Sequence, residues 1–343
     1  MNATNDSKFK ETYPEGSFFD VSEEALKTVD ICINCILVHL LGMFGFTGNG
    51  LNIVVLTHHG MRTTTNLILF YLAVCDLCFS CMTLIYYSQK IVFYMNQYWS
   101  TTWSSYVYVT LNPVQTWLFF TSTYLVLILS AERMVAVCFP FHVAILISRS
   151  RIKLVVGVFV FILAGLLSPY YGATYLDNAI MNNITVVLRY KTDFSLNSYF
   201  YYCSFVSSIY VTAIITFLVL LFTLMTLIAL TKSSKNLRHL SSAAMLRRAR
   251  EMRSAKTSLF LSTSLICLVL VPSGLMDALL STKSYMLYFT HNALMLLNTF
   301  KQVLYVLNSS FNFVFYVITS PKFAQTFRNI FRNKKYLKYS KIA

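Results

Sequence analysis

Three charged residues stand inside or at the end of long apolar segments, where charge is costly. Glu132 and Arg133 directly follow a segment, 106–131, that contains no Asp, Glu, Lys or Arg. Asp76 is the only charged residue within a second segment, 66–89. In hydrocarbon a carboxylate must be protonated or paired with a cation, and a guanidinium must be held by a neighbour or by water. These residues are therefore candidates for a function; the alternatives are a helix that merely ends in charges and, for Asp76, a packing acid hydrogen-bonded to Asn49.

The composition indicates which elements must position these charges. Of 343 residues, 56% are hydrophobic and 12% are charged, whereas about a quarter of the residues of a soluble domain are charged. The chain is therefore predicted to be a membrane protein. Its net charge of +15 is concentrated in a few connections and a tail, so we expect no nucleic-acid partner. Most cysteines fall inside or beside apolar segments, as small buried residues do.

Seven segments almost free of charge are long enough to cross a bilayer, which takes about 20 residues per helix. They predict an all-α fold, a seven-transmembrane helix bundle with its two termini on opposite sides of the membrane. The last segment is expected to begin some residues before its charge-free part. The segments are 31–56, 66–89, 106–131, 154–171, 199–230, 257–280 and 302–319.

The basic residues predict the orientation of the bundle, because Lys and Arg gather in cytoplasmic connections. Both 149–153 and 232–256 are rich in Lys and Arg, and the tail after Ser320 contains seven basic residues and no acid. Residues 1–30 contain seven acidic residues and three lysines. We therefore expect the N-terminus to be extracellular and the protein to be a multi-pass protein of the plasma membrane.

This orientation divides the chain into three parts. Residues 1–30 form an extracellular tail, 31–320 the seven-transmembrane domain, and 321–343 a cytoplasmic amphipathic helix with a basic tail that contacts membrane lipids. Three glycosylation sequons fall on the predicted outer side. They begin at Asn2, Asn5 and Asn183.

Four short motifs follow one another along the predicted spans. They are Gly48-Asn49, Leu72-Ala73-Val74-Cys75-Asp76, Glu132-Arg133-Met134 and Asn308-Ser309-Ser310-Phe311-Asn312-Phe313-Val314-Phe315-Tyr316. Together they resemble the rhodopsin-like G-protein-coupled receptors over nearly the whole chain. Phe313 stands where the last motif of that family has proline.

The resemblance implies that ligand binding outside the cell is transmitted to a heterotrimeric G protein, with no catalysis by this chain. The implied switch residues are Glu132, Arg133, Pro272, Asn312 and Tyr316. In this view Glu132 holds Arg133 at rest and releases it to meet the G protein, Pro272 kinks the sixth span, and Tyr316 swings inward on activation.

The resemblance also implies an allosteric sodium site and no other metal or cofactor. Its residues would be Asp76, Ser122, Asn308 and Asn312. One carboxylate with hydroxyl and amide oxygens is a suitable shell for a hard cation, independently of the family.

Some positions depart from the resemblance. Tyr108 stands where the family has a cysteine at the outer end of the third span, so the usual disulfide to the second outer loop is not expected and Cys203 is left without that partner. Leu270 replaces a tryptophan two residues before Pro272. The trigger of this receptor need not be an aromatic side chain.

The expected ligand site lies in the outer half of the bundle. Amine receptors carry an aspartate where this chain has Gln115, and opsins carry a lysine where it has Val306, so neither ligand class is expected. The overall pattern is closest to neuropeptide receptors, loosely those for FMRFamide-like peptides. The candidate ligand residues are Gln115, Phe119, Asp277, Lys301 and Tyr305.

Several alternatives stay open at this point. Asp277 either binds an arginine of a peptide or simply pairs with Lys301 or with water. A chemosensory receptor of the same fold, for an environmental small molecule, is the main alternative function. A membrane transporter is a remote one, because no internal repeat is seen. A metalloenzyme would need His and acidic residues at ligand spacing, whereas His39 and His291 are isolated.

Overall fold

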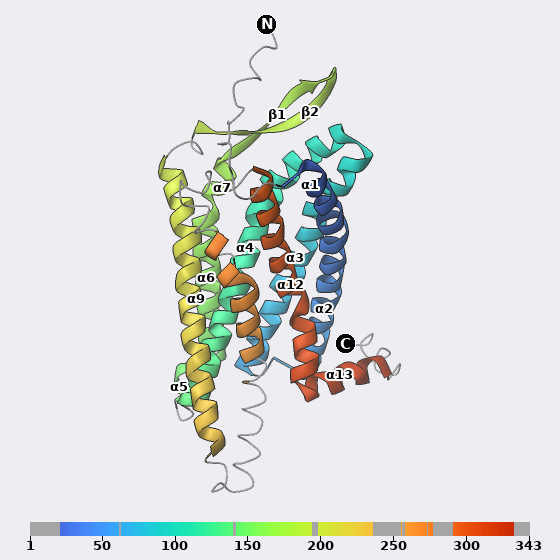
Figure 1. The fold of residues 1–343 in the computed structure, drawn as a ribbon. Coiled ribbons are helices and arrows are strands. Elements are labelled where there is room, and N and C mark those ends of the chain that lie inside the picture. The colour runs from blue at the N-terminus through green and yellow to red at the C-terminus, as the bar shows by residue number, and fades with distance from the viewer. Residues whose placement is uncertain are drawn as a thin grey trace, which may run out of the picture.

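Long helices packed side by side make up the protein (Figure 1). The computed structural model describes residues 21–61, 63–139, 142–193, 198–235, 255, 258–272, 274–276 and 291–332. The helices are α1 (Glu23–Val29), the π-helical segment η1 (Asp30–Leu37), α2 (Val38–His59), α3 (Thr64–Met95), α4 (Gln97–Cys138), α5 (Val143–Leu146), α6 (Arg149–Leu167), α7 (Pro169–Gly172), α9 (Ser198–Lys235), a helix over Ser258–Met276 that contains the π-helical segment η3 (Ile266–Leu270), α12 (His291–Thr319) and α13 (Pro321–Arg332).

Side-chain caps fix where three of these helices begin. The hydroxyl of Thr63 accepts a hydrogen bond from the Asn66 amide at the start of α3, and Ser148 caps α6 in the same way. The side chain of Asn96 accepts from the first amides of α4. Such caps satisfy N–H groups that the helix itself leaves unpaired. Asn96 is also the single residue between α3 and α4, so these two helices are tightly connected.

Helix α4 begins at Gln97, nine residues before the expected start at 106. Helix α12 begins at His291, before its charge-free part, as expected. The added part of α4 is rich in Ser and Thr, whose hydroxyls donate to carbonyls of the preceding turn; Thr101 bonds the Gln97 carbonyl at 2.9 Å and Ser105 bonds that of Thr101 at 3.0 Å. These bonds satisfy the hydroxyl groups within the helix without favouring it, and the Asn96 cap fixes its start.

Six helices in the described part of the chain are long and apolar enough to cross a membrane. They match six of the seven predicted spans, and many of their large apolar side chains are exposed, as lipid-facing side chains are. The fourth predicted span, 154–171, is divided into α6 and α7 at Pro169. Proline has no N–H to donate, which explains the break.

The second outer loop contains a β-hairpin that the sequence did not predict. Strands β1 (Thr174–Met181) and β2 (Ile184–Lys191) pair antiparallel, and Asn182 and Asn183 form the turn with positive φ angles of 48° and 62°. Asparagine tolerates this left-handed conformation better than most residues. The hairpin lies across the outer end of the bundle, above α4 (Figure 1). Asn183, the third sequon, is exposed at its tip.

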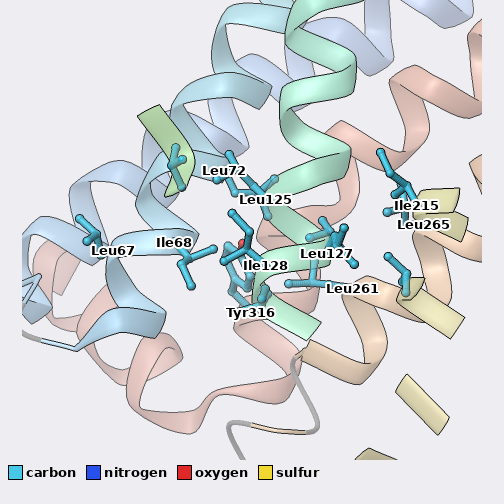
Figure 2. Close-up of a cluster of buried hydrophobic side chains, with 14 of the residues drawn as sticks. Leu67, Ile68, Leu72, Leu125, Leu127, Ile128, Ile215, Leu261, Leu265 and Tyr316 are labelled. Carbon is cyan, nitrogen blue, oxygen red and sulfur yellow. The ribbon is translucent and has the colours of Figure 1, made fainter. Parts of the chain in front are cut away.

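The main apolar core lies in the inner half of the bundle. It brings together Leu72 of α3, Leu125 of α4, Ile215 of α9, Leu261 of the 258–276 helix and Tyr316 of α12. Figure 2 shows these side chains filling the space between the helices. A smaller core cluster lies in the outer half and includes Phe79, Leu118 and Val306. Helix α13 turns away from the bundle at its inner end (Figure 1), as the predicted amphipathic helix should.

Candidate ligand cavity and inner switch

Glu132 and Arg133 form a buried ion pair at the inner end of α4. Their exposed fractions are 4% and 8%. Arg133 donates from Nε to Glu132 Oε2 at 2.7 Å and from Nη2 to Oε1 at 2.8 Å. Two parallel charge-assisted bonds fix the guanidinium against the carboxylate. The alternative in which the helix merely ends in solvated charges does not agree with this burial.

The ion pair is also bound to α3. The hydroxyls of Thr64 and Thr65 donate to Glu132 Oε1 at 3.0 and 2.9 Å, and Arg133 Nη2 donates to the Thr65 hydroxyl. Sequence reasoning missed both threonines. They follow the capping residue Thr63, and three consecutive threonines at the start of a helix were the available signal. The switch pair is therefore held by its own helix and by the start of α3.

Asp76 lies in the middle of the bundle and is 1% exposed. Ser122 of α4 donates to its Oδ1 at 2.7 Å, and Asn312 of α12 donates to its Oδ2. Asn308 is buried one turn before Asn312 but makes no hydrogen bond to Asp76 within the described residues. The described residues form two ion pairs, Arg133–Glu132 and Lys90–Asp30. Neither of them includes Asp76.

In the packing alternative Asn49 would bond Asp76, but the structure gives Asn49 other partners. Its amide donates to the Ser309 carbonyl of α12 and to the Gly45 carbonyl of its own helix, both at 2.9 Å, and it accepts from Asn52. It thus joins α2 to α12 and is not bonded to Asp76. Helices α2, α3 and α12 approach closely at Gly45, where a Cβ would lie 2.6 Å from Ser80 Oγ.

Phe313, which replaces the proline of the last motif, packs between two helices. A Cβ on Gly48 of α2 would lie 3.0 Å from Phe313 Cβ, so the contact depends on the glycine. The ring also meets Phe327 of α13 edge to face, with centroids 5.3 Å apart. The departure from the family motif thus places an aromatic side chain where α13 joins the bundle.

Tyr316 and Pro272 are two of the predicted switch residues, and the structure describes both. Tyr316 is buried beside Phe323 of α13, and its hydroxyl has no partner among the described residues. Pro272 follows η3, where the 258–276 helix is locally wider than an α-helix.

Ser262 of the 258–276 helix lies 2.6 Å from the hydroxyl of Ser130 on α4, a contact between two buried serines.

Four of the five predicted ligand residues line one cavity of about 180 Å³ in the outer half. They are Gln115, Phe119, Lys301 and Tyr305. The rings of Phe119 and Tyr305 stack with centroids 4.2 Å apart, and Gln115 donates to Thr83 at 2.9 Å. Asp277, the fifth, lies outside the described residues. Two of the three sequons, at Asn2 and Asn5, do so as well.

A larger cavity of about 990 Å³ opens above the first and shares Asn112, Gln115 and Gln302 with it. Lys90 pairs with Asp30 in its wall at 2.8 Å. The guanidinium of Arg189, on β2, lies 3.5 Å above the ring of Tyr108. Sequence reasoning singled out Tyr108 for the absent cysteine but did not connect it with Arg189, because the hairpin was not predicted.

The bundle of long apolar helices, with a buried acid–guanidinium pair at its inner end and a cavity at its outer end, is the architecture of a seven-transmembrane G-protein-coupled receptor. The chain matches the family described as serpentine type 7TM GPCR chemoreceptor Srw over residues 36–334 and belongs to that family. It is also 25% identical to the FMRFamide receptor of Drosophila melanogaster over 319 residues. That match covers 88% of this chain and 54% of the fly protein, so the chain spans about half the length of this curated relative.

Membership of the family confirms the predicted all-α bundle and several broader predictions. The protein is a multi-pass receptor of the plasma membrane. Receptors of this class are not enzymes.

Proposed function

We propose that this receptor binds a neuropeptide outside the cell and passes the signal to heterotrimeric G proteins. The observation that carries the proposal is the pair of connected cavities, which share Asn112, Gln115 and Gln302. A short peptide can lie across the larger cavity and insert one side chain against Phe119 and Tyr305. The likeness to a receptor named for FMRFamide supports a peptide ligand.

A chemosensory receptor for an environmental small molecule is the second candidate. The family name itself describes chemoreceptors, and the 180 Å³ cavity alone has room for a small compound. The two candidates differ in how much of the cavity system the ligand fills. A peptide needs the larger cavity as well, whereas a small molecule does not.

In the proposed resting state, Glu132 and the threonines of α3 hold Arg133 at the inner end. Ligand binding favours a second arrangement in which Arg133 is released toward the G protein, Tyr316 moves inward and the 258–276 helix shifts at Pro272. The lone hydroxyl of Tyr316 and the π-helical segment before Pro272 support these roles. The N-terminus is extracellular in this proposal, and Asn2, Asn5 and Asn183 carry glycans.

The Asp76 site is proposed to bind sodium in the resting state. Its donor set of carboxylate, hydroxyl and amide oxygens suits a hard cation, and Asp76, Ser122 and Asn312 would hold the ion, with Asn308 near by. Replacing NaCl by choline chloride at constant ionic strength should raise basal signalling of the wild type. Asp76→Asn should lose this response, whereas Asp177→Asn, on the exposed hairpin, should keep it; a sodium response retained in Asp76→Asn contradicts the assignment.

The test of the main proposal compares the wild type with Arg133→Ala in cells challenged with neuropeptides, both amidated and with a free C-terminal carboxylate, and with small odorants. Surface expression of the two receptors is measured alongside G-protein activation. A peptide response that Arg133→Ala loses supports the proposal. A response to odorants alone moves the receptor to the chemosensory candidate, and equal signalling from both receptors refutes the role of Arg133.

A further inference from the structure

The side chain of Arg189 is the starting point for an inference about the ligand itself. It projects from β2 into the wall of the larger cavity, with the face of its guanidinium 3.5 Å from the ring of Tyr108. Stacking on an aromatic ring uses the face of the guanidinium and leaves the N–H groups at its edge available. Arg189 accordingly has no hydrogen-bond acceptor or carboxylate partner among the described residues.

The other charges of this cavity are compensated differently. The described lining contains Lys27, Asp30, Lys90 and Arg189 as its charged residues. The carboxylate of Asp30 accepts from Lys90 and from Asn34, each at 2.8 Å, so that it is already occupied. Lys27 and Arg189 are both exposed, but Lys27 follows acidic residues of its own helix by one turn. Within the described lining, basic groups outnumber acidic ones. Arg189 is the one of these cations that stacks on an aromatic ring, that of Tyr108.

We propose that the larger cavity recognises a carboxylate of the ligand through Arg189. The planar guanidinium presents paired N–H donors that match the two oxygens of a carboxylate, and an amide cannot accept in the same bidentate way. Tyr108 fixes the plane of the guanidinium before the ligand arrives, which lowers the conformational cost of binding. This inference rests on the proposed ligand-binding role of the cavities and adds the chemical class of the ligand.

The carboxylate can come from a peptide, as its C-terminus or an acidic side chain, or from a small organic acid. Both sources share the chemistry that Arg189 selects. They differ in size, and therefore in whether binding also depends on the deeper cavity around Phe119 and Tyr305. An experiment with both kinds of probe separates them.

The test measures binding to the purified full-length receptor in lipid nanodiscs, by thermal shift and by titration. One probe set is a library of tetrapeptides prepared with free C-terminal carboxylates and again as C-terminal amides. The other is a series of straight-chain carboxylic acids with their primary amides. We expect acid-terminated probes of one set to stabilise the wild type and their amide counterparts to bind much more weakly. Arg189→Gln should weaken the acid probes about 10- to 100-fold and leave the amides unchanged.

Three further variants distinguish recognition from a purely structural role. Lys27→Gln removes a positive charge from the same cavity and should change acid affinity by less than about twofold. Arg189→Lys keeps the charge without the fork of donors and should recover part of the affinity for acids. If Arg189 only holds the hairpin on Tyr108, Arg189→Gln and Tyr108→Leu will weaken acids and amides equally, and that result overturns the inference.

The inference is also overturned if no acid probe of either set stabilises the wild type, or if acids and amides bind equally well. Its failure is distinguishable from failure of the proposed signalling function, because nanodisc binding does not require a G protein. A receptor that prefers acids through Arg189 but activates no G protein in cells would keep this inference and refute the signalling proposal.

Discussion

At the inner end of the bundle, polar groups are buried and bonded to one another across helices, whereas at the outer end they line cavities and remain partly exposed. The Glu132–Arg133 pair has side chains that are 5% and 9% exposed, against 22% and 32% for Asp30 and Lys90. A buried pair of charges interacts more strongly than an exposed one, and losing one partner costs more. The difference indicates stronger polar contacts at the inner end and weaker, more adaptable ones at the outer end.

The same contrast holds for the contacts between helices. Hydrogen bonds near Asp76 and Asn49 hold α2, α3, α4 and α12 together. A larger side chain at Gly45 would meet atoms of the neighbouring helices. At the outer end, the hairpin reaches α4 through the Val187 amide bonded to Thr102 at 3.2 Å and through Asn182 bonded to Tyr98 at 3.1 Å. Both bonds lie at the long end of hydrogen-bond distances; the Asn182–Tyr98 bond is exposed and the Val187–Thr102 bond is partly buried. Substitutions should therefore have effects that decrease from the inner half to the hairpin.

The largest effect is expected at Gly45. A Cβ there would lie 2.6 Å from Ser80 Oγ and 2.7 Å from Ser310 Oγ, so Gly45→Ala should lower the free energy of unfolding by about 1–3 kcal/mol. Thermal unfolding of the purified receptor measures this. Gly50→Ala is the matched control, because nothing lies within 4 Å of its Cβ, and it should be neutral or stabilising by up to about 1 kcal/mol. Equal unfolding temperatures for the two variants would contradict the close helix approach.

A smaller but specific effect is expected at Thr65. Thr65→Val removes a hydroxyl that bonds both members of the Glu132–Arg133 pair while keeping the shape of the side chain. We expect basal G-protein activation without ligand to rise as the resting state is weakened, roughly tenfold in the ratio of active to resting receptor. Thr57→Val is the control, since its hydroxyl bonds within α2 and is exposed. Unchanged basal activity in Thr65→Val would show that α3 does not hold the switch.

The contact between Ser130 and Ser262 should contribute less, because both groups are neutral. Ser130→Ala breaks the 2.6 Å contact between α4 and the 258–276 helix and should raise basal activation about fivefold. Ser264→Ala removes a hydroxyl that bonds its own helix and should have no such effect. The two variants would behave alike if the 258–276 helix were not restrained by α4 at this point.

The smallest effect is expected at the hairpin. Thr102→Val removes the acceptor of the Val187 amide, and hydrogen exchange of that amide should become about threefold faster. Thr110→Val, further along α4, serves as the control, since its hydroxyl bonds only the Tyr106 carbonyl. An exchange rate at Val187 that does not change would mean that other contacts hold the hairpin.

The sequence predicted the features that are costly in a membrane. Glu132, Arg133 and Asp76 were found because charge next to long apolar segments requires partners, and Ser122 and Asn312 were added by resemblance. It did not predict contacts that depend on which faces of distant segments meet. Thr64 and Thr65 are ordinary capping-region threonines until α4 lies beside them, and Arg189 is an ordinary loop residue until the hairpin places it over Tyr108. The break at Pro169 was readable but was overlooked among apolar neighbours.

The manner in which the hairpin is attached has a consequence for the rate of ligand exchange. Strands β1 and β2 contain no cysteine, and they are held by hydrogen bonds, the Arg189–Tyr108 stack and the buried side chain of Val186. Noncovalent contacts of this kind break and form again by thermal motion, and no redox reaction is needed. The residence time of a bound ligand should therefore depend on temperature, and reducing agents should leave it unaltered.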